Sequence, residues 1–153
     1  MQKIIYHKII LNCEIHRAFE FFIVSELLEQ WLTEKADVEP ILGGKYELFW
    51  TPDNRNINST LGCKITGIEE DSFIAFDWKG PVQFKSFMND ADPLTHVIIT
   101  FNKLSSNPNK TIIQLFHTGW RNGEKWLKAY EYFNHAWRNA LDTLMENKKR
   151  ILQ

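Results

Sequence analysis

The sequence predicts an α+β fold in which a curved antiparallel sheet wraps around one long C-terminal helix. Residues 124–150 carry apolar side chains at alternating steps of four and three, which is the spacing of one face of an α-helix. Before them lies a run of segments in which apolar and polar residues alternate, as in strands with one buried face. Because no helical pattern separates the later strands, we expect them to pair antiparallel.

The long helical segment has an aromatic stripe that needs a broad apolar partner. Its opposite face is polar, and Glu124 in the first turn suits the positive end of the helix dipole. At about 1.5 Å per residue the helix would be roughly 40 Å long, so it is expected to pack across a whole sheet. The stripe consists of Trp126, Tyr130, Phe133, Trp137, Ala140 and Leu144.

The chain before this helix divides into one strand, two short helices and a run of further strands. Residues 3–12 are rich in isoleucine and predict the first strand, and residues 14–23 predict a short amphipathic helix. Ser25 is a candidate N-cap for a second short helix. The later strands are predicted over residues 45–50, 61–66, 73–78, 95–102 and 111–117.

Length and charge limit the class of protein. The chain has 153 residues, which suits a single domain spanning residues 1–153. The formal net charge of -1 and the lack of a long basic block argue against a nucleic-acid-binding surface. No window of about eighteen residues is apolar throughout, and the N-terminus lacks the signal-peptide pattern. We therefore expect no membrane span and a cytoplasmic location.

Cysteine and histidine spacing predicts neither a metal nor a cofactor. Cys13 and Cys63 are too few for a disulfide framework and match no metal motif, so both are predicted to be small buried hydrophobes. The histidines do not pair at ligand spacings. The glycine pair at residues 43–44 lacks the lysine pattern of a phosphate-binding loop.

Aromatic residues make up 14% of the chain, which is more than routine packing requires. Large rings leave gaps between them, and ligand pockets are lined mainly by such residues with a few polar groups. The same residues could equally fill a closed core. The candidate pocket residues between sheet and helix are Trp31, Tyr46, Phe76, Trp78, Phe101, His117, Trp126, Tyr130, Phe133, Asn134 and Trp137.

His117 lies in phase with Ile113 and Leu115, so its imidazole is predicted to point toward the helix. It could orient a ligand or transfer a proton, or it could be a core histidine that bonds a backbone carbonyl. No carboxylate partner is evident, so we assign no catalytic residue. Asn134 lies at the edge of the helical stripe and could supply a second polar group.

The connection of residues 80–93 holds Phe84, Phe87 and Met88 among polar residues. Loops lie on the surface, where apolar side chains without a partner are unfavourable. The segment is therefore predicted to fold over one end of the cavity. It could be a mobile lid that closes over a ligand, or a docked loop that extends the core.

A series of short motifs covers nearly the whole chain: Phe22, Leu28 and Trp31; Gly43, Gly44 and Gly62; Trp78; Thr95, Val97 and Ile99; Thr111 through His117 to Gly119 and Trp120; and Trp137, Leu141 and Leu144. Their order resembles the START-type helix-grip superfamily, which includes the birch-pollen allergen. The similarity is greater to the branch named for the C-terminal domain of the activator of the ninety-kilodalton heat-shock-protein ATPase. One departure is Ala136, where the branch has glycine, and alanine is the better helix former.

The resemblance implies a helix-grip fold that holds a small hydrophobic or amphipathic ligand between sheet and helix. One alternative is a protein-interaction or chaperone-cofactor module, as the branch name implies. The outward positions Ile98, Ile112 and Phe116 are the candidate surface for it, and these three could instead form a dimer contact or be covered by a loop. Another is an enzyme that uses His117 on a bound apolar substrate. The eukaryotic activator has a further N-terminal domain for chaperone contact, which 153 residues do not accommodate, so the sequence does not support a chaperone partner.

Overall fold

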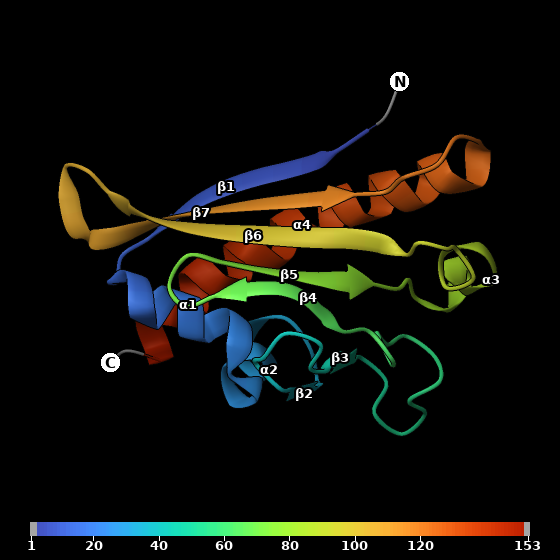
Figure 1. Cartoon of the computed structure of the whole chain (residues 1–153), viewed down its shortest axis with the longest axis horizontal. Helices are drawn as coiled ribbons and strands as arrows, with labels where there is room; N and C mark the ends of the chain where they lie inside the picture. Colours follow the sequence, from blue (N-terminus) through green and yellow to red (C-terminus); the bar gives the residue numbers. More distant parts are fainter. Residues whose placement is uncertain (1–2, 152–153) are drawn as a thin grey trace.

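The computed structural model describes residues 3–151, with side chains described up to residue 146. Its elements follow the predicted order of a strand, two short helices, further strands and one long helix (Figure 1). Their bounds are β1 (Ile5–Leu11), α1 (Ile15–Ile23), α2 (Ser25–Trp31), β2 (Lys35–Val38), β3 (Tyr46–Phe49), β4 (Ile65–Glu69), β5 (Phe73–Trp78), the 3-10 helix η1 (Val82–Phe84), α3 (Lys85–Met88), β6 (Thr95–Leu104), β7 (Asn107–Thr118) and α4 (Glu124–Ile151).

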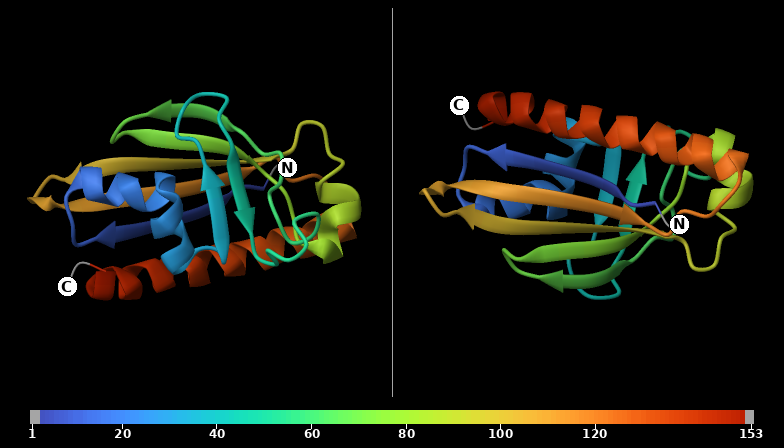
Figure 2. Two further views of the ribbon diagram at one scale, coloured as in Figure 1. Left: turned by 90° about the horizontal axis from the view of Figure 1, so that it is seen from below. Right: turned by 90° about the horizontal axis from the view of Figure 1, so that it is seen from above.

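Five strands form one antiparallel sheet in the order β1-β7-β6-β5-β4. In the central hairpin, Val97 pairs with His117 and Ile99 pairs with Leu115. Directly opposed residues share a face, so this register places all four side chains on the side of α4. The sheet curves around the long helix, as two further views show (Figure 2). The predicted fold, a curved antiparallel sheet around one C-terminal helix, is confirmed.

β2 and β3 form a separate two-stranded sheet rather than part of the large one. β2 was not predicted, because four residues are too few for alternation to be recognised. The Ser25 hydroxyl accepts the backbone N–H of Val38 at 3.1 Å, which anchors β2 to the start of α2. The prediction that Ser25 caps this helix is therefore wrong, since Val24 occupies the N-cap position.

The third predicted strand is displaced along the chain. β4 covers Ile65–Glu69, whereas alternation had placed it over residues 61–66. Gly62 has a φ of +87°, in the left-handed region that favours glycine, and the N–H of Cys63 bonds the carbonyl of Thr60 at 2.9 Å. Residues 60–63 therefore form a turn in which small and apolar residues happen to alternate.

The apolar stripe of α4 packs on the sheet as predicted. Phe133, Trp137 and Leu144 are buried in the core, while Trp126 and Tyr130 at the start of the helix are half-buried. The N-terminal part of the stripe thus lies at the rim of the core, where side chains can meet a cavity as well as the sheet.

Both cysteines are buried, as predicted. Burial raises the pKa of the Cys63 thiol to about 12, so this group stays protonated and unreactive. Among the described residues no helix, α4 included, carries a stretch apolar enough to cross a membrane.

Candidate functional site

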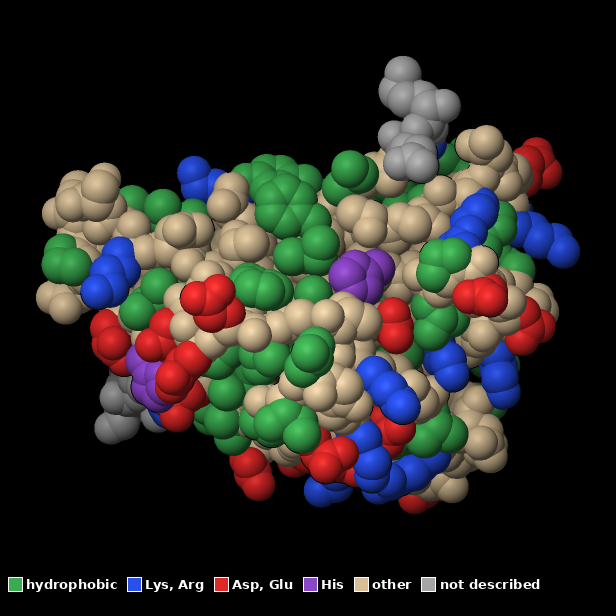
Figure 3. All heavy atoms as spheres, in the orientation of Figure 1, with side chains coloured by type: hydrophobic (Ala, Val, Ile, Leu, Met, Phe, Trp, Pro, Cys, Tyr) green, Lys and Arg blue, Asp and Glu red, His purple; other side chains and the backbone are tan. Residues whose placement is uncertain are grey.

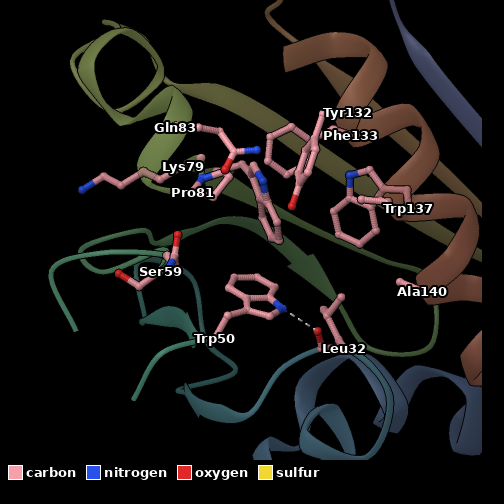
Figure 4. A pocket seen from close by; sticks show the side chains of 14 residues that line it. Leu32, Trp50, Ser59, Lys79, Pro81, Gln83, Tyr132, Phe133, Trp137 and Ala140 are labelled. Carbon is pink, nitrogen blue, oxygen red and sulfur yellow. Dashed lines mark hydrogen bonds between the residues drawn. The ribbon is translucent and has the colours of Figure 1, made fainter. Parts of the chain in front are cut away.

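A pocket of about 360 Å³ opens beside α4, next to the end of β5 and the segment that follows it (Figure 4). We call it the side pocket. Its volume lies within the range of roughly 300–1,000 Å³ that is typical of small-molecule sites. The lining residues are mainly apolar: Leu32, Trp50, Asn58, Ser59, Trp78, Lys79, Gly80, Pro81, Gln83, Tyr132, Phe133, Ala136, Trp137 and Ala140.

Three tryptophans from different parts of the chain form the aromatic wall of the side pocket. Trp78, the last residue of β5, lies 5.8 Å from Trp50 and 5.0 Å from Trp137 between ring centroids. Trp50 is held in place because its indole N–H donates to the carbonyl of Leu32 at 2.9 Å. The rings meet at 72° and 46°, and such tilted contacts do not close the space between them. The small side chain of Ala136 leaves room in front of this wall.

Residues 80–93 form the short helices η1 and α3, and Gly80, Pro81 and Gln83 of this segment line one end of the pocket. The ring of Phe84 lies 5.3 Å from that of Tyr132, and the ring of Phe87 lies 5.1 Å from that of Trp126. Met88 is fully buried. The segment therefore contacts the aromatic residues of α4, as the sequence predicted, while motion as a lid stays a prediction.

His117 is fully buried and faces the helix, as predicted. The indole N–H of Trp137 donates to Nδ1 of His117 at 3.0 Å, and Nε2 lies 3.0 Å from the hydroxyl oxygen of Thr95. An indole N–H can only donate, so Nδ1 must accept and the ring proton lies on Nε2. The partners of this histidine are thus two side chains rather than the backbone carbonyl expected for a core histidine.

The environment of His117 is unsuited to proton transfer near neutral pH. Burial lowers the pKa of His117 to about 3, with a smaller effect from the charge of His96. The ring is therefore neutral, and both of its nitrogens are already hydrogen-bonded. We infer that His117 positions the sheet against α4 and does not act as a general acid or base.

Four candidate pocket residues lie in the filled core instead. Tyr46 stacks on Phe76 with ring centroids 3.8 Å apart, and its hydroxyl donates to the carbonyl of Phe22 at 2.7 Å. The indole of Trp31 donates to another carbonyl in the last turn of α1 at 3.0 Å. Phe101 packs edge-on against Phe22. The last carbonyls of a helix lack intrahelical partners, so these two polar rings complete the end of α1.

The other candidates divide between two cavities and the surface. Trp78, Phe133 and Trp137 line the side pocket, whereas Trp126 and Tyr130 line a second cavity of about 300 Å³ at the start of α4. Asn134 lines neither and is exposed, and its backbone carbonyl bonds Nε2 of His7 at 2.9 Å. The prediction for Asn134 is therefore corrected, because one step past Phe133 turns a helical side chain by about 100°.

Several lining residues of the side pocket were not predicted. Tyr132 and Ala136 are four residues apart and share the flank of the stripe, so helical spacing could have identified both. Leu32 and Gln83 reach the pocket from the end of α2 and from η1. No local pattern identifies these two, because their approach depends on how distant segments pack.

One surface group combines side chains of types that bind metals. His16 of α1 meets Glu70 and Asp71 of the β4–β5 turn, with ligand-type atoms within 4.8 Å of one another. Nδ1 of His16 lies 2.8 Å from the Asp71 carboxylate, and this hydrogen bond raises the pKa of His16. Sequence spacing did not predict the group, because His16 is far from Glu70 and Asp71 in the sequence. These residues meet only because α1 lies beside the β4–β5 turn in the fold.

The face of the large sheet that is remote from α4 exposes apolar side chains (Figure 3). Tyr6 and Ile10 of β1 are exposed, and the ring of Tyr6 lies 5.1 Å from that of Phe116. The outward positions Ile98 and Ile112 are half-buried beside them. The three predicted outward positions thus lie on this face in β6 and β7, and Tyr6 and Ile10 of β1 extend it.

The fold and the side pocket define a helix-grip domain with an apolar cavity of ligand size beside its long helix. Residues 12–147 match the family described as Activator of Hsp90 ATPase homolog 1-like protein, and the chain belongs to this family. This agrees with the resemblance in the sequence. The chain has no significant match among curated proteins.

Solved structures of low sequence identity share the fold. A crystal structure of a Mesorhizobium loti protein is similar with a TM-score of 0.75 at 14% identity, covering 97% of this chain and 98% of that chain. The solution structure of the Aha1 dimer from Colwellia psychrerythraea has a TM-score of 0.67 at 14% identity, with 94% of each chain covered. An HSP90 activator from Plasmodium falciparum has a TM-score of 0.65 at 20% identity, covering 92% of this chain and 93% of that chain.

Proposed function

We propose that the protein binds a small apolar or amphipathic molecule in the side pocket. The observation that supports this is the wall formed by Trp50, Trp78 and Trp137, which encloses about 360 Å³ beside the small side chain of Ala136. Apolar surface that leaves water on binding contributes about 25 cal/mol per Å². A ligand that fits between these rings would therefore gain most of its affinity from burial.

A substitution that fills the side pocket is the most direct test of this proposal. Ala136→Phe places a ring on the pocket-facing side of α4, whereas the control Asn139→Phe places the same ring at an exposed position of the same helix. We expect an apolar fluorescent dye to bind the wild type and Asn139→Phe alike, and to bind Ala136→Phe at least tenfold more weakly. Native mass spectrometry of the purified protein should show a retained small molecule that Ala136→Phe lacks. Equal dye binding by all three proteins would rule out the side pocket.

A second candidate function is support of an Hsp90-type ATPase. It is favoured by the family description and by the exposed apolar residues Tyr6 and Ile10 on the outer face of the sheet. The test is the ATP hydrolysis rate of an Hsp90-type chaperone with and without this protein. Stimulation that Tyr6→Lys abolishes, and that Ala136→Phe leaves intact, would favour this function over ligand binding.

A further inference from the structure

The turn between β4 and β5 brings two carboxylates to a histidine of α1 at the surface of the protein (Figure 1). Nδ1 of His16 lies 2.8 Å from a carboxylate oxygen of Asp71 and 3.8 Å from one of Glu70. The three ligand-type atoms all lie within 4.8 Å of one another. A tetrahedral ion with bonds of about 2.0–2.2 Å separates its ligand atoms by roughly 3.3–3.6 Å. Small rotations of exposed side chains therefore bring the three atoms onto one ion.

The other nitrogen of the same ring faces a further carboxylate. Nε2 of His16 lies 4.0 Å from an oxygen of Glu20, which is one turn further along α1. Histidines that bind a metal ion usually direct the remaining ring N–H to a carboxylate, which fixes the tautomer and the orientation of the ring. With the ring proton on Nε2, toward Glu20, the lone pair of Nδ1 is free to bind an ion beside Glu70 and Asp71. An ordinary ion pair needs one carboxylate, whereas this ring has carboxylates beside both nitrogens.

The group keeps negative charge that a cation would neutralise. Among the described residues, Glu70 and Asp71 form no ion pair except with His16, while Glu20 is also paired with Arg17 at 3.3 Å. The hydrogen bond to Asp71 and the charges of the three carboxylates raise the pKa of His16. The site thus already attracts positive charge in the form of a proton. A divalent ion carries twice that charge and binds in place of the proton.

The backbone on both sides of the group is fixed. In the turn, the N–H of Ser72 donates to the carbonyl of Glu69 at 3.0 Å. On the other side, α1 is held in the core by buried residues that include Phe19 and Phe22. Ligand side chains on rigid elements lose little freedom when they bind an ion. The side chain of His16 is half exposed, so an ion and its water can reach Nδ1.

From these observations we propose that His16, Glu70 and Asp71 bind a divalent transition-metal ion of the Zn²⁺ type. One imidazole nitrogen and two carboxylate oxygens are ligands that zinc accepts, whereas Ca²⁺ and Mg²⁺ prefer oxygen alone. Water takes the fourth position, and any second proton on the imidazole leaves to the solvent. The ion ties α1 to the β4–β5 turn. None of the three ligands lines the side pocket, so this inference does not rest on the proposed function.

Calorimetric titration with Zn²⁺ tests the site directly, on protein freed of metal with EDTA and dialysed at pH 7. We expect one zinc ion to bind per chain, and His16→Gln to bind it at least tenfold more weakly because the nitrogen ligand is lost. The matched control is His135→Gln, since His135 is exposed on α4 and belongs to no such group among the described residues. Equal zinc affinity in the wild type and His16→Gln would mean an adventitious ion only and would overturn the proposal.

The carboxylates are tested by Asp71→Asn, which should also weaken zinc binding at least tenfold. Asp71 has a φ of +60°, and asparagine adopts this left-handed conformation as readily as aspartate, so the turn is retained. Asp90→Asn, at an exposed position outside the group, is its control and should bind zinc like the wild type. Mg²⁺ at the same concentration should not displace the zinc. Displacement by Mg²⁺ would show that carboxylates alone hold the ion and would overturn the assignment to a transition metal.

NMR spectra of the histidine ring nitrogens locate the ion. Zinc should shift the Nδ1 signal of His16, keep the proton on Nε2 and leave the signals of His135 in place. Movement of another histidine without His16 would overturn the site. Zinc should also raise the urea midpoint of the wild type and not that of His16→Gln, because the ion binds where α1 and the turn are held together. Ala136→Phe fills the side pocket and should bind zinc like the wild type, so either proposal can fail without the other.

Discussion

Trp137 donates its indole N–H to Nδ1 of His117 across 3.0 Å, and this bond joins the long helix to the last strand of the sheet. Both side chains are buried. The bond fixes the tautomer of the imidazole and directs its other nitrogen to the hydroxyl of Thr95. Loss of either ring leaves a polar group without a partner in the interior, where the cost is larger than the net gain from an ordinary hydrogen bond.

The first prediction concerns this pair. Trp137→Phe and His117→Phe should each lower the free energy of unfolding by about 1–3 kcal/mol, because each leaves the other partner unpaired. The double variant should be less destabilised than the sum of the two, since neither member of the Trp137–His117 pair is then left without the other. The hydroxyl of Thr95 loses Nε2 of His117 in both variants that lack the imidazole. Urea unfolding followed by circular dichroism measures all three. Strictly additive losses would show that the two rings are not coupled.

The second prediction concerns pH. The pKa of His117 is lowered to about 3 in the fold, against an ordinary value of 6.5. Above pH 6.5 the folded and unfolded chains are both neutral at this residue, so it adds no pH dependence. Below that pH only the unfolded chain binds the proton, and the free energy of unfolding should fall by about 1.4 kcal/mol per pH unit until about pH 3.

The control is the difference between the wild type and His117→Phe, measured by urea unfolding between pH 7 and pH 4. The wild type should lose stability more steeply than the variant, and parallel curves would contradict the prediction.

His16 has the opposite effect on the pH dependence of stability, because the hydrogen bond to Asp71 raises its pKa. Its contribution is complete below the unfolded pKa and is lost as the pH rises through the folded pKa. His16→Gln in both backgrounds removes that effect.

The third prediction separates core aromatics from pocket aromatics. Tyr46→Phe leaves the carbonyl of Phe22 unpaired and should cost about 1–3 kcal/mol of unfolding free energy. It should leave dye binding unchanged, because Tyr46 does not line the side pocket. Calorimetric unfolding and dye titration of the same sample decide both points. Weaker dye binding without loss of stability would place Tyr46 in the binding site.

The long helix and the strands β5, β6 and β7 could be predicted because periodicity is a local signal. Side chains that face the core recur at helical spacing in the stripe from Trp126 to Leu144. They alternate with outward side chains around Ile113 and Leu115. β2 and the turn at Gly62 could not be predicted from such patterns. β2 depends on a hydrogen bond from the backbone N–H of Val38 to the hydroxyl of Ser25. The turn at Gly62 interrupts a run whose residues alternate as in a strand although the run does not form one.

The candidate site was only partly predictable for a related reason. Periodicity identifies which side chains point inward, but it does not distinguish a ring that fills the core from a ring that borders a cavity. Tyr46 and Trp78 both point inward, yet Tyr46 stacks on Phe76, whereas Trp78 meets its neighbours at tilted or edge-on angles beside a space. That difference depends on the angles between rings from distant segments, which no local pattern encodes.

The last prediction concerns the segment of residues 80–93, for which the sequence left a mobile lid and a docked loop as alternatives. The structure contains two ring contacts that hold it against α4, between Phe84 and Tyr132 and between Phe87 and Trp126. In addition, Met88 is fully buried. A segment held by a buried side chain opens only at a cost in free energy. We therefore expect the docked loop.

Limited proteolysis with trypsin tests this at Lys85, which is exposed on α3 and donates to the carbonyl of Asn56 at 2.8 Å. Cleavage there should be slow, and an apolar ligand should not change its rate. Met88→Ala should speed cleavage, because it removes the buried anchor and should destabilise the docked segment by about 2–5 kcal/mol. Rapid cleavage of the wild type that a bound apolar ligand suppresses would instead establish the lid, since closure over a ligand would protect the segment.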